Sequence, residues 1–169
     1  QKFLLAVFGT KPLPKLDFSK GIPDEFKTMV VIPTIVKNKK RIEEVFESLE
    51  QYYLINKTKN IYFALLADGF ENSEEYHEDD EKIVEAGLEV VQRLNEKYGD
   101  NIFHFVYRKR KYNEGEGSWL GFERKRGGLL HFNDLLLDNL SKEEKKEYFH
   151  IQTFDDFEYK IKYVITLDV

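Results

Sequence analysis

Polar residues follow four apolar runs of the sequence, at the points where a sheet would present them to a ligand. Pro33 and Thr34 follow the first run, Asp68 ends the second, and a basic cluster, residues 108–110, follows the third. Asp168 ends the last run. In open α/β sheets ligands bind outside the carboxyl ends of the strands, so these groups suit a ligand with an anion, a metal and a polar ring. A nucleoside diphosphate compound fits, although polar residues also end many strands because strands run out into solvent.

A glycine-punctuated segment, residues 113–130, carries further candidate chemistry. It holds five glycines, the single tryptophan, Trp119, and three consecutive cations, residues 124–126, just before a predicted helix. Glycines let a backbone approach a phosphate closely, and a helix N-terminus adds the positive end of its dipole. The segment is not a P-loop, and no GxGxxG follows a strand. It therefore indicates either a diphosphate-binding segment or a solvated charged loop.

Apolar patterns predict the elements that must position these residues. Strands are expected at residues 28–34, 60–69, 102–107 and 161–168. Helices are expected at residues 39–55, 83–94 and 129–140, with residues 108–128 as loop. This alternation predicts an α/β fold, a mainly parallel sheet with helices on both faces.

Several side chains are expected to have structural roles only. The first helix has apolar residues at helical spacing, which are Ile42, Val45, Phe46, Leu49, Tyr52 and Tyr53. The second helix is predicted to pack through five apolar residues, which are Ile83, Val84, Leu88, Val91 and Leu94. The acidic run 74–81 is expected to be a solvated loop and helix start, where carboxylates favour the helix dipole. The four histidines have no metal-type spacing, and His104 is expected to be packed or on the surface rather than a ligand.

Composition excludes several classes of protein. The chain has 169 residues, 41% of them hydrophobic and 34% charged, which indicates one globular domain. It has no cysteine, so a disulfide scaffold and a thiolate metal site are ruled out. A net charge of -5 argues against a nucleic-acid binder. No apolar run approaches the roughly 20 residues of a membrane span.

The chain is expected to be a fragment of a longer protein. Residues 1–27 are predicted to be an extended connector because they are rich in proline and glycine, and residues 28–169 form the folded part. The sequence starts at Gln1 and stops inside a hydrophobic strand, residues 164–169. An unpaired hydrophobic strand at the sheet edge invites pairing, so dimerisation through this edge is expected.

Five stretches of the sequence resemble the glycosyltransferase domain of cyclic β-1,2-glucan synthases, classed as glycosyltransferase family 84. These stretches are residues 13–23, 30–34, 63–68, 115–127 and 163–168. The combination of Gly-Glu-Gly-x-Trp with Glu-Arg-Lys-Arg-Gly is specific, whereas the strand motifs occur in many nucleotide-sugar enzymes. The resemblance implies the Rossmann-like, nucleotide-binding half of a GT-A fold. It also implies a cytoplasm-facing domain of an inner-membrane protein that extends a β-1,2-glucan from UDP-glucose.

The resemblance also implies roles for individual residues. Pro33 and Thr34 would lie beside the uracil and ribose, and Asp68 would accept a hydrogen bond from the uracil N3–H. The donor-site residues implied beyond these are Lys125, Arg126, Gly127 and Asn133, with Lys125 and Arg126 facing the diphosphate. Asp168 is similar to the first acid of an Asp-x-Asp motif, which holds Mg²⁺ or Mn²⁺. Trp119 could stack on a sugar ring or simply anchor its loop.

The sequence departs from the family pattern at its end, because Val169 stands one residue before the second acid would occur. The acceptor half and the general base are also expected in the remaining domains of the parent chain, so this chain alone is predicted not to transfer glucose. The alternative is a noncatalytic module whose basic loops, residues 108–111 and 124–126, bind an anionic membrane surface or a phosphorylated partner.

Overall fold

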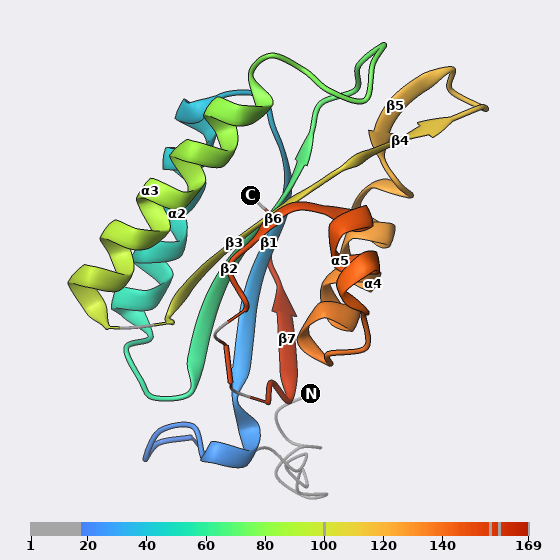
Figure 1. Cartoon of the computed structure of the whole chain (residues 1–169). Helices are drawn as coiled ribbons and strands as arrows, with labels where there is room; N and C mark the ends of the chain where they lie inside the picture. Colours follow the sequence, from blue (N-terminus) through green and yellow to red (C-terminus); the bar gives the residue numbers. More distant parts are fainter. Residues whose placement is uncertain (1–17, 100, 156, 159, 169) are drawn as a thin grey trace, which may run out of the picture.

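The computed structural model describes residues 18–99, 101–155, 157–158 and 160–168 (Figure 1). Most of the predicted connector, residues 1–17, lies outside the described residues. Its remainder contains a short 3₁₀ helix, η1, at Asp24–Phe26. Whether residue 27 marks a domain boundary stays a prediction.

Five strands form one sheet in the spatial order β6-β3-β2-β1-β7. The strands are β1 (Thr28–Val36), β2 (Ile61–Gly69), β3 (Phe103–Arg108), β6 (Phe149–Gln152) and β7 (Tyr163–Thr166). Neighbouring strands run parallel, except that β6 pairs antiparallel with β3 at one edge. The prediction of a mainly parallel sheet is confirmed, and the arrangement is Rossmann-like.

Helices cover both faces of the sheet (Figure 1). Helices α2 (Lys39–Ile55) and α3 (Asp80–Tyr98) pack on one face, and α4 (Arg124–Leu136) and α5 (Lys142–Tyr148) lie on the other. The two-stranded hairpin of β4 (Arg110–Asn113) and β5 (Ser118–Gly121) projects beyond the sheet. This arrangement matches the predicted layers.

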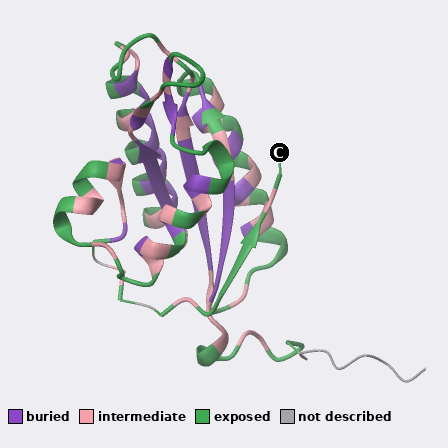
Figure 2. Cartoon of the chain, turned by 90° about the vertical axis from the view of Figure 1, so that its right-hand side faces the viewer, coloured by how far each residue is buried: buried purple, intermediate pink, exposed green. Residues whose placement is uncertain are grey.

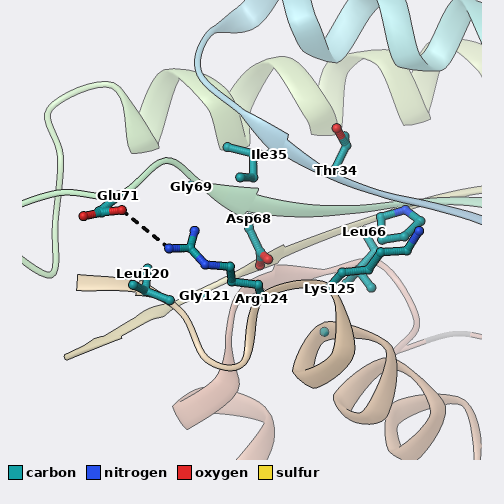
Figure 3. Close-up of a pocket in the computed structure, with 12 residues that line it drawn as sticks. Thr34, Ile35, Leu66, Asp68, Gly69, Glu71, Leu120, Gly121, Arg124 and Lys125 are labelled. Atoms are coloured by element: carbon teal, nitrogen blue, oxygen red, sulfur yellow. Dashed lines mark ion pairs between the residues drawn. The ribbon is translucent and has the colours of Figure 1, made fainter. Parts of the chain in front are cut away.

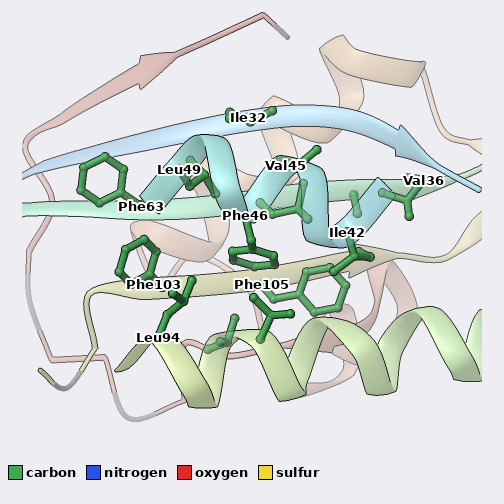
Figure 4. Packing of buried hydrophobic residues seen from close by; sticks show 14 of the residues in the cluster. Ile32, Val36, Ile42, Val45, Phe46, Leu49, Phe63, Leu94, Phe103 and Phe105 are labelled. Carbon is green, nitrogen blue, oxygen red and sulfur yellow. The ribbon is translucent and has the colours of Figure 1, made fainter. Parts of the chain in front are cut away.

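Helix α2 has the predicted bounds and the predicted inner face. It begins after Asn38, whose side chain accepts a hydrogen bond from the Arg41 N–H and so satisfies one of the free donors of the first turn. Its buried side chains come from the apolar stripe read in the sequence (Figure 4), namely Ile42, Val45, Phe46, Leu49 and Tyr53. They pack with one face of β1, β2 and β3 to form the larger of two hydrophobic cores.

Helix α3 uses a slightly different face from the one predicted. Ile83, Val91 and Leu94 are buried, but Leu88 is exposed. Its neighbour Gly87 faces the sheet instead, and a Cβ atom on Gly87 would lie 2.3 Å from the Phe105 ring. The ring occupies the place of a side chain, so the helix approaches β3 closely and turns Leu88 outward.

The region between β3 and α4 was predicted wrongly as loop. Residues 110–121 form the β4–β5 hairpin, and α4 begins at Arg124 rather than near residue 129. Helix α5 and strand β6 were not predicted as separate elements, because both are short and β6 has no continuous apolar run.

Strand β1 continues through Pro33 and Thr34 to Val36, two residues beyond its predicted end. Its pairing with β2 extends to Val36 opposite Gly69, whereas its pairing with β7 ends at Val31. Val31 accepts a hydrogen bond from the Leu167 N–H on the β7 side. The nitrogen of Pro33, two residues on, faces the same side beyond β7, so its missing N–H interrupts no strand pairing.

Strand β7 is exposed, unlike its neighbour β1 (Figure 2). Tyr163, Val164 and Ile165 are apolar and exposed, although residues of β1 that pair with them are buried. Helices α2 and α4 therefore do not cover this edge. The dimerisation expected for it stays a prediction.

His104 lies fully inside the sheet and is packed, as expected. One ring nitrogen is 3.1 Å from the Thr153 carbonyl oxygen and the other is 3.0 Å from that of Asn101. The ring also stacks on Phe154. Burial lowers the pKa of His104 to about 4, because the charged imidazolium loses its hydration there.

We expect His104 to make the protein sensitive to mild acid. The unfolded chain binds a proton at this residue below about pH 6.5, whereas the native state does so only near pH 4. Stability is therefore lost as the pH falls through this window, by about 3 kcal/mol in total. Urea unfolding at pH 7 and pH 4.5 measures the loss, and His104→Gln should show a smaller one. Equal losses in both proteins would contradict the assignment.

Candidate functional site

A cavity of about 250 Å³ opens at the carboxyl ends of β1 and β2, between these strands, β5 and α4 (Figure 3). Its lining combines apolar side chains, two carboxylates at and after the end of β2, and two cations from α4. The lining residues are Pro33, Thr34, Ile35, Leu66, Asp68, Gly69, Glu71, Leu120, Gly121, Arg124, Lys125 and Gly128. The cavity therefore lies at the carboxyl edge of the sheet, where the sequence predicts a ligand site.

The structure brings some of the predicted site residues together and leaves others apart. Those that line the cavity are Pro33, Thr34, Asp68 and Lys125. Arg126 is exposed and forms an ion pair with Glu123, one turn back in the chain. Gly127 is buried, and Asn133 is exposed on α4. Neither contributes to the cavity lining.

Trp119 also lies outside the cavity lining, although its neighbours Leu120 and Gly121 belong to it. Its ring packs edge-on against Tyr112 at 5.8 Å between centroids. Its backbone N–H and C=O both pair with Asn72, which joins the hairpin to the segment after β2. These contacts anchor the hairpin through Trp119, and the sugar-stacking role of this residue stays a prediction.

Asp68 is held by a buried arginine, Arg108, which belongs to the basic cluster predicted at the ligand edge of the sheet. The Arg108 side chain is 1% exposed and the Asp68 side chain is 14% exposed. Arg108 Nε donates to Asp68 Oδ1 at 2.6 Å and Nη2 donates to Oδ2 at 2.7 Å. Each carboxylate oxygen has a second lone-pair site, so Asp68 retains acceptor capacity toward the cavity.

Arg108 also holds the turn that leads into α4. Its guanidinium donates to the carbonyl oxygen of Phe122 at 3.2 Å and to that of Arg124 at 2.8 Å. One buried side chain therefore connects the end of β2 with the start of α4, the two elements that supply the carboxylate and the cations of the cavity. No local pattern in the sequence distinguishes Arg108 from the neighbouring basic residues.

The glycines around the cavity are required by close packing. A Cβ atom on Gly121 would lie 2.6 Å from Asp68 Cγ, and one on Gly128 would lie 3.2 Å from the Arg108 guanidinium. A Cβ atom on Gly127 would lie 2.1 Å from the Phe122 carbonyl oxygen. Glycine at these positions lets the hairpin and α4 pack closely around the Asp68–Arg108 ion pair. The phosphate contact predicted for this segment stays a prediction.

A second buried ion pair fastens the hairpin to α3. Arg110 Nη1 donates to Asp80 Oδ2 at 2.5 Å and Nη2 donates to Oδ1 at 3.0 Å, while the Tyr107 hydroxyl donates to Oδ1 at 2.6 Å. A Cβ atom on Gly69 would lie 2.2 Å from Arg110 Nη2 and 2.7 Å from the Tyr107 hydroxyl. The network therefore fills the space beside the last residue of β2.

This network corrects the prediction for the acidic run. Asp80 belongs to that run, which was expected to be solvated, yet it is buried. Burial opposes its ionisation, but the hydrogen bonds from Arg110 and Tyr107 outweigh burial and hold the pKa of Asp80 below its usual value. Arg108 and Arg110 are both buried and paired, so these two side chains are not available to a membrane surface or a phosphorylated partner. The module alternative itself stays a prediction.

Asp168 lies near the cavity through its ion pair with Lys125, and its side chain is 87% exposed. Among the residues that the structure describes, no group of three or more His, Cys, Asp or Glu side chains could hold a metal ion. One carboxylate does not make a site for Mg²⁺, which needs near-octahedral oxygen coordination. The described residues therefore do not form a complete metal site, and the metal role of Asp168 stays a prediction.

The fold and the cavity define an α/β protein with a candidate ligand site at the carboxyl edge of a Rossmann-like sheet. Over 155 residues, 90% of this chain, the sequence is 34% identical to the cyclic beta-(1,2)-glucan synthase NdvB of Rhizobium meliloti (strain 1021). The chain spans only 5% of the length of that protein. No family model matches the chain. The chain is thus related to a short region of a glucan synthase.

None of the helices in the described part of the chain is long and apolar enough to cross a membrane.

Proposed function

We propose that this chain is the nucleotide-binding portion of a glycosyltransferase that builds β-1,2-glucan from UDP-glucose. The observation that carries the proposal is the cavity, which places the Asp68 carboxylate, apolar walls and the cations of Arg124 and Lys125 around one space. The relationship to a glucan synthase supports the sugar chemistry. The GT-A fold, the glucan acceptor, the metal and the inner-membrane location are parts of the same proposal.

Each part of the cavity has a task in this proposal. Asp68, fixed by Arg108, accepts a hydrogen bond from the N–H of the uracil ring. Ile35, Leu66 and Leu120 offer apolar surface to the base, and the cations at the start of α4 attract the diphosphate. A volume of about 250 Å³ lies below the usual range for small-molecule sites. The cavity therefore suits the nucleoside, with the phosphates at its mouth.

Titration calorimetry with UDP, and with ADP as the comparison, tests this function. We expect UDP-selective binding, because adenine has no N–H equivalent to the uracil N3–H. Asp68→Asn should weaken UDP binding by roughly tenfold to a hundredfold, the usual contribution of a hydrogen bond to a charged group. Runs in Mn²⁺ and in EDTA report whether a metal contributes.

The matched control is Glu147→Gln, which removes an exposed ion pair between α5 and Lys111 and leaves the cavity lining intact. It should bind UDP like the unchanged chain. Equal affinity for UDP and ADP, or an unchanged affinity in Asp68→Asn, would contradict the proposed role of Asp68.

A further inference from the structure

We propose that Arg124 is an exchangeable cation of this site: Glu71 and Glu116 hold it in the ligand-free chain, and the diphosphate of the nucleotide takes their place. The inference rests on the proposed function and concerns how the diphosphate of the ligand reaches the Arg124 guanidinium. It concerns a residue outside the donor-site set predicted from the sequence.

Arg124 stands between two carboxylates from different elements. Its Nη2 atom lies 3.6 Å from Glu71 Oε2 and is also hydrogen-bonded to Glu116 Oε2. Glu71 follows β2, and Glu116 lies in the turn of the β4–β5 hairpin. All three side chains are about half exposed. Ion pairs in this setting contribute about 0–1 kcal/mol each, so a ligand can displace them at little cost.

The Glu71–Arg124 pair, marked by the dashed line in Figure 3, lines two cavities. The proposed nucleoside cavity shares Ile35, Glu71 and Arg124 with a second cavity of about 590 Å³. Lys37, Phe70 and Asp79 also line this second space. A ligand that occupies the first cavity and extends past its mouth therefore meets the Arg124 guanidinium and its two acidic partners.

The backbone of Arg124 is held by a buried side chain, whereas its guanidinium is held only by two half-exposed carboxylates. Arg108 donates to the Arg124 carbonyl oxygen at 2.8 Å, which ties this residue to the buried ion pair. The half-exposed guanidinium has five N–H donors in a planar fork, a geometry that matches phosphate oxygens in a bidentate manner. Arg126, by contrast, is outside the lining of both cavities.

The exchange predicts that removing the competing acids tightens UDP binding. Glu71→Gln and Glu116→Gln should each increase UDP affinity about threefold, and the double variant about tenfold. Arg124→Gln should weaken UDP binding about tenfold. Binding of uridine, which has no phosphate, should be unchanged in all four variants, because none of these side chains is proposed to contact the base.

Calorimetric titration of UDP and of uridine into each variant tests the inference, with Glu147→Gln as the remote acid-to-amide control. The replaced side chains are half exposed, so equal melting temperatures are expected for all variants. UDP affinity that is unchanged in the double variant and in Arg124→Gln, in a chain that binds UDP, overturns the inference and leaves the proposed function standing. Absence of both UDP and uridine binding in the unchanged chain overturns both.

Discussion

Asp80→Ala should lower the free energy of unfolding by about 3–5 kcal/mol, the largest effect expected of any single change in this chain. The variant leaves the Arg110 guanidinium buried without its carboxylate, and it leaves the Tyr107 hydroxyl without its acceptor. The desolvation cost of both groups then remains uncompensated. Urea-induced unfolding at pH 7, followed by circular dichroism, measures the loss.

The neighbouring residue provides the control. Asp79 carries the same side chain, but its pairs with Lys82 and His77 are partly exposed, so Asp79→Ala should cost less than about 1 kcal/mol. Replacing Asp80 and Arg110 together by leucine and methionine should recover much of the lost stability, because no unpaired charge remains. Similar losses in Asp79→Ala and Asp80→Ala would show that the buried pair has no special role.

Arg108→Lys should impair both stability and nucleotide binding. Lysine keeps the charge, but a single ammonium group cannot replace the forked contact with Asp68 and also reach the carbonyl oxygens of Phe122 and Arg124. We expect a loss of about 2–3 kcal/mol in unfolding free energy and a roughly tenfold weaker affinity for UDP. The second effect follows because the turn that carries the cavity cations loses its attachment to β2.

Arg93→Lys is the matched control for this substitution, since Arg93 is exposed on α3 and lies outside the cavity lining. It should change neither the unfolding free energy nor the affinity for UDP. Urea unfolding and UDP titration on the same samples separate the two effects. If Arg108→Lys loses stability but binds UDP normally, Arg108 is a folding residue without a positioning role at the site.

The parts of the fold that depend on periodic patterns were predictable. Helix α2 has the predicted bounds, and the three buried parallel strands lie where continuous apolar runs occur. Strand β6 was missed because it is short and pairs with β3, which lies far from it in the sequence. The β4–β5 hairpin was missed because only four residues of each strand pair, and these strands contain too few apolar residues to reveal a strand pattern.

The place of the site at the edge of the sheet was predictable, but the ion pairs and hydrogen bonds within the site were not. The position of Asp68 follows from the strand that it ends. Its partner Arg108 stands among other cations in the sequence, and only the fold shows that Arg108 and Arg110 point into the protein while Lys109 and Lys111 do not. Likewise, Arg124 lines the cavity and Arg126 does not, because the first residue of α4 faces that space and the third residue does not.

The crowded surroundings of Gly69 limit how this region can change in evolution. Arg110 and the Tyr107 hydroxyl occupy the volume that any side chain at position 69 would need. A larger residue there therefore becomes acceptable only in a lineage that has already lost the arginine, and losing the arginine first leaves Asp80 buried without its charge partner. The residues at positions 69, 80 and 110 are therefore expected to change together or to stay unchanged. Related sequences should contain either glycine, arginine and aspartate together, or none of them.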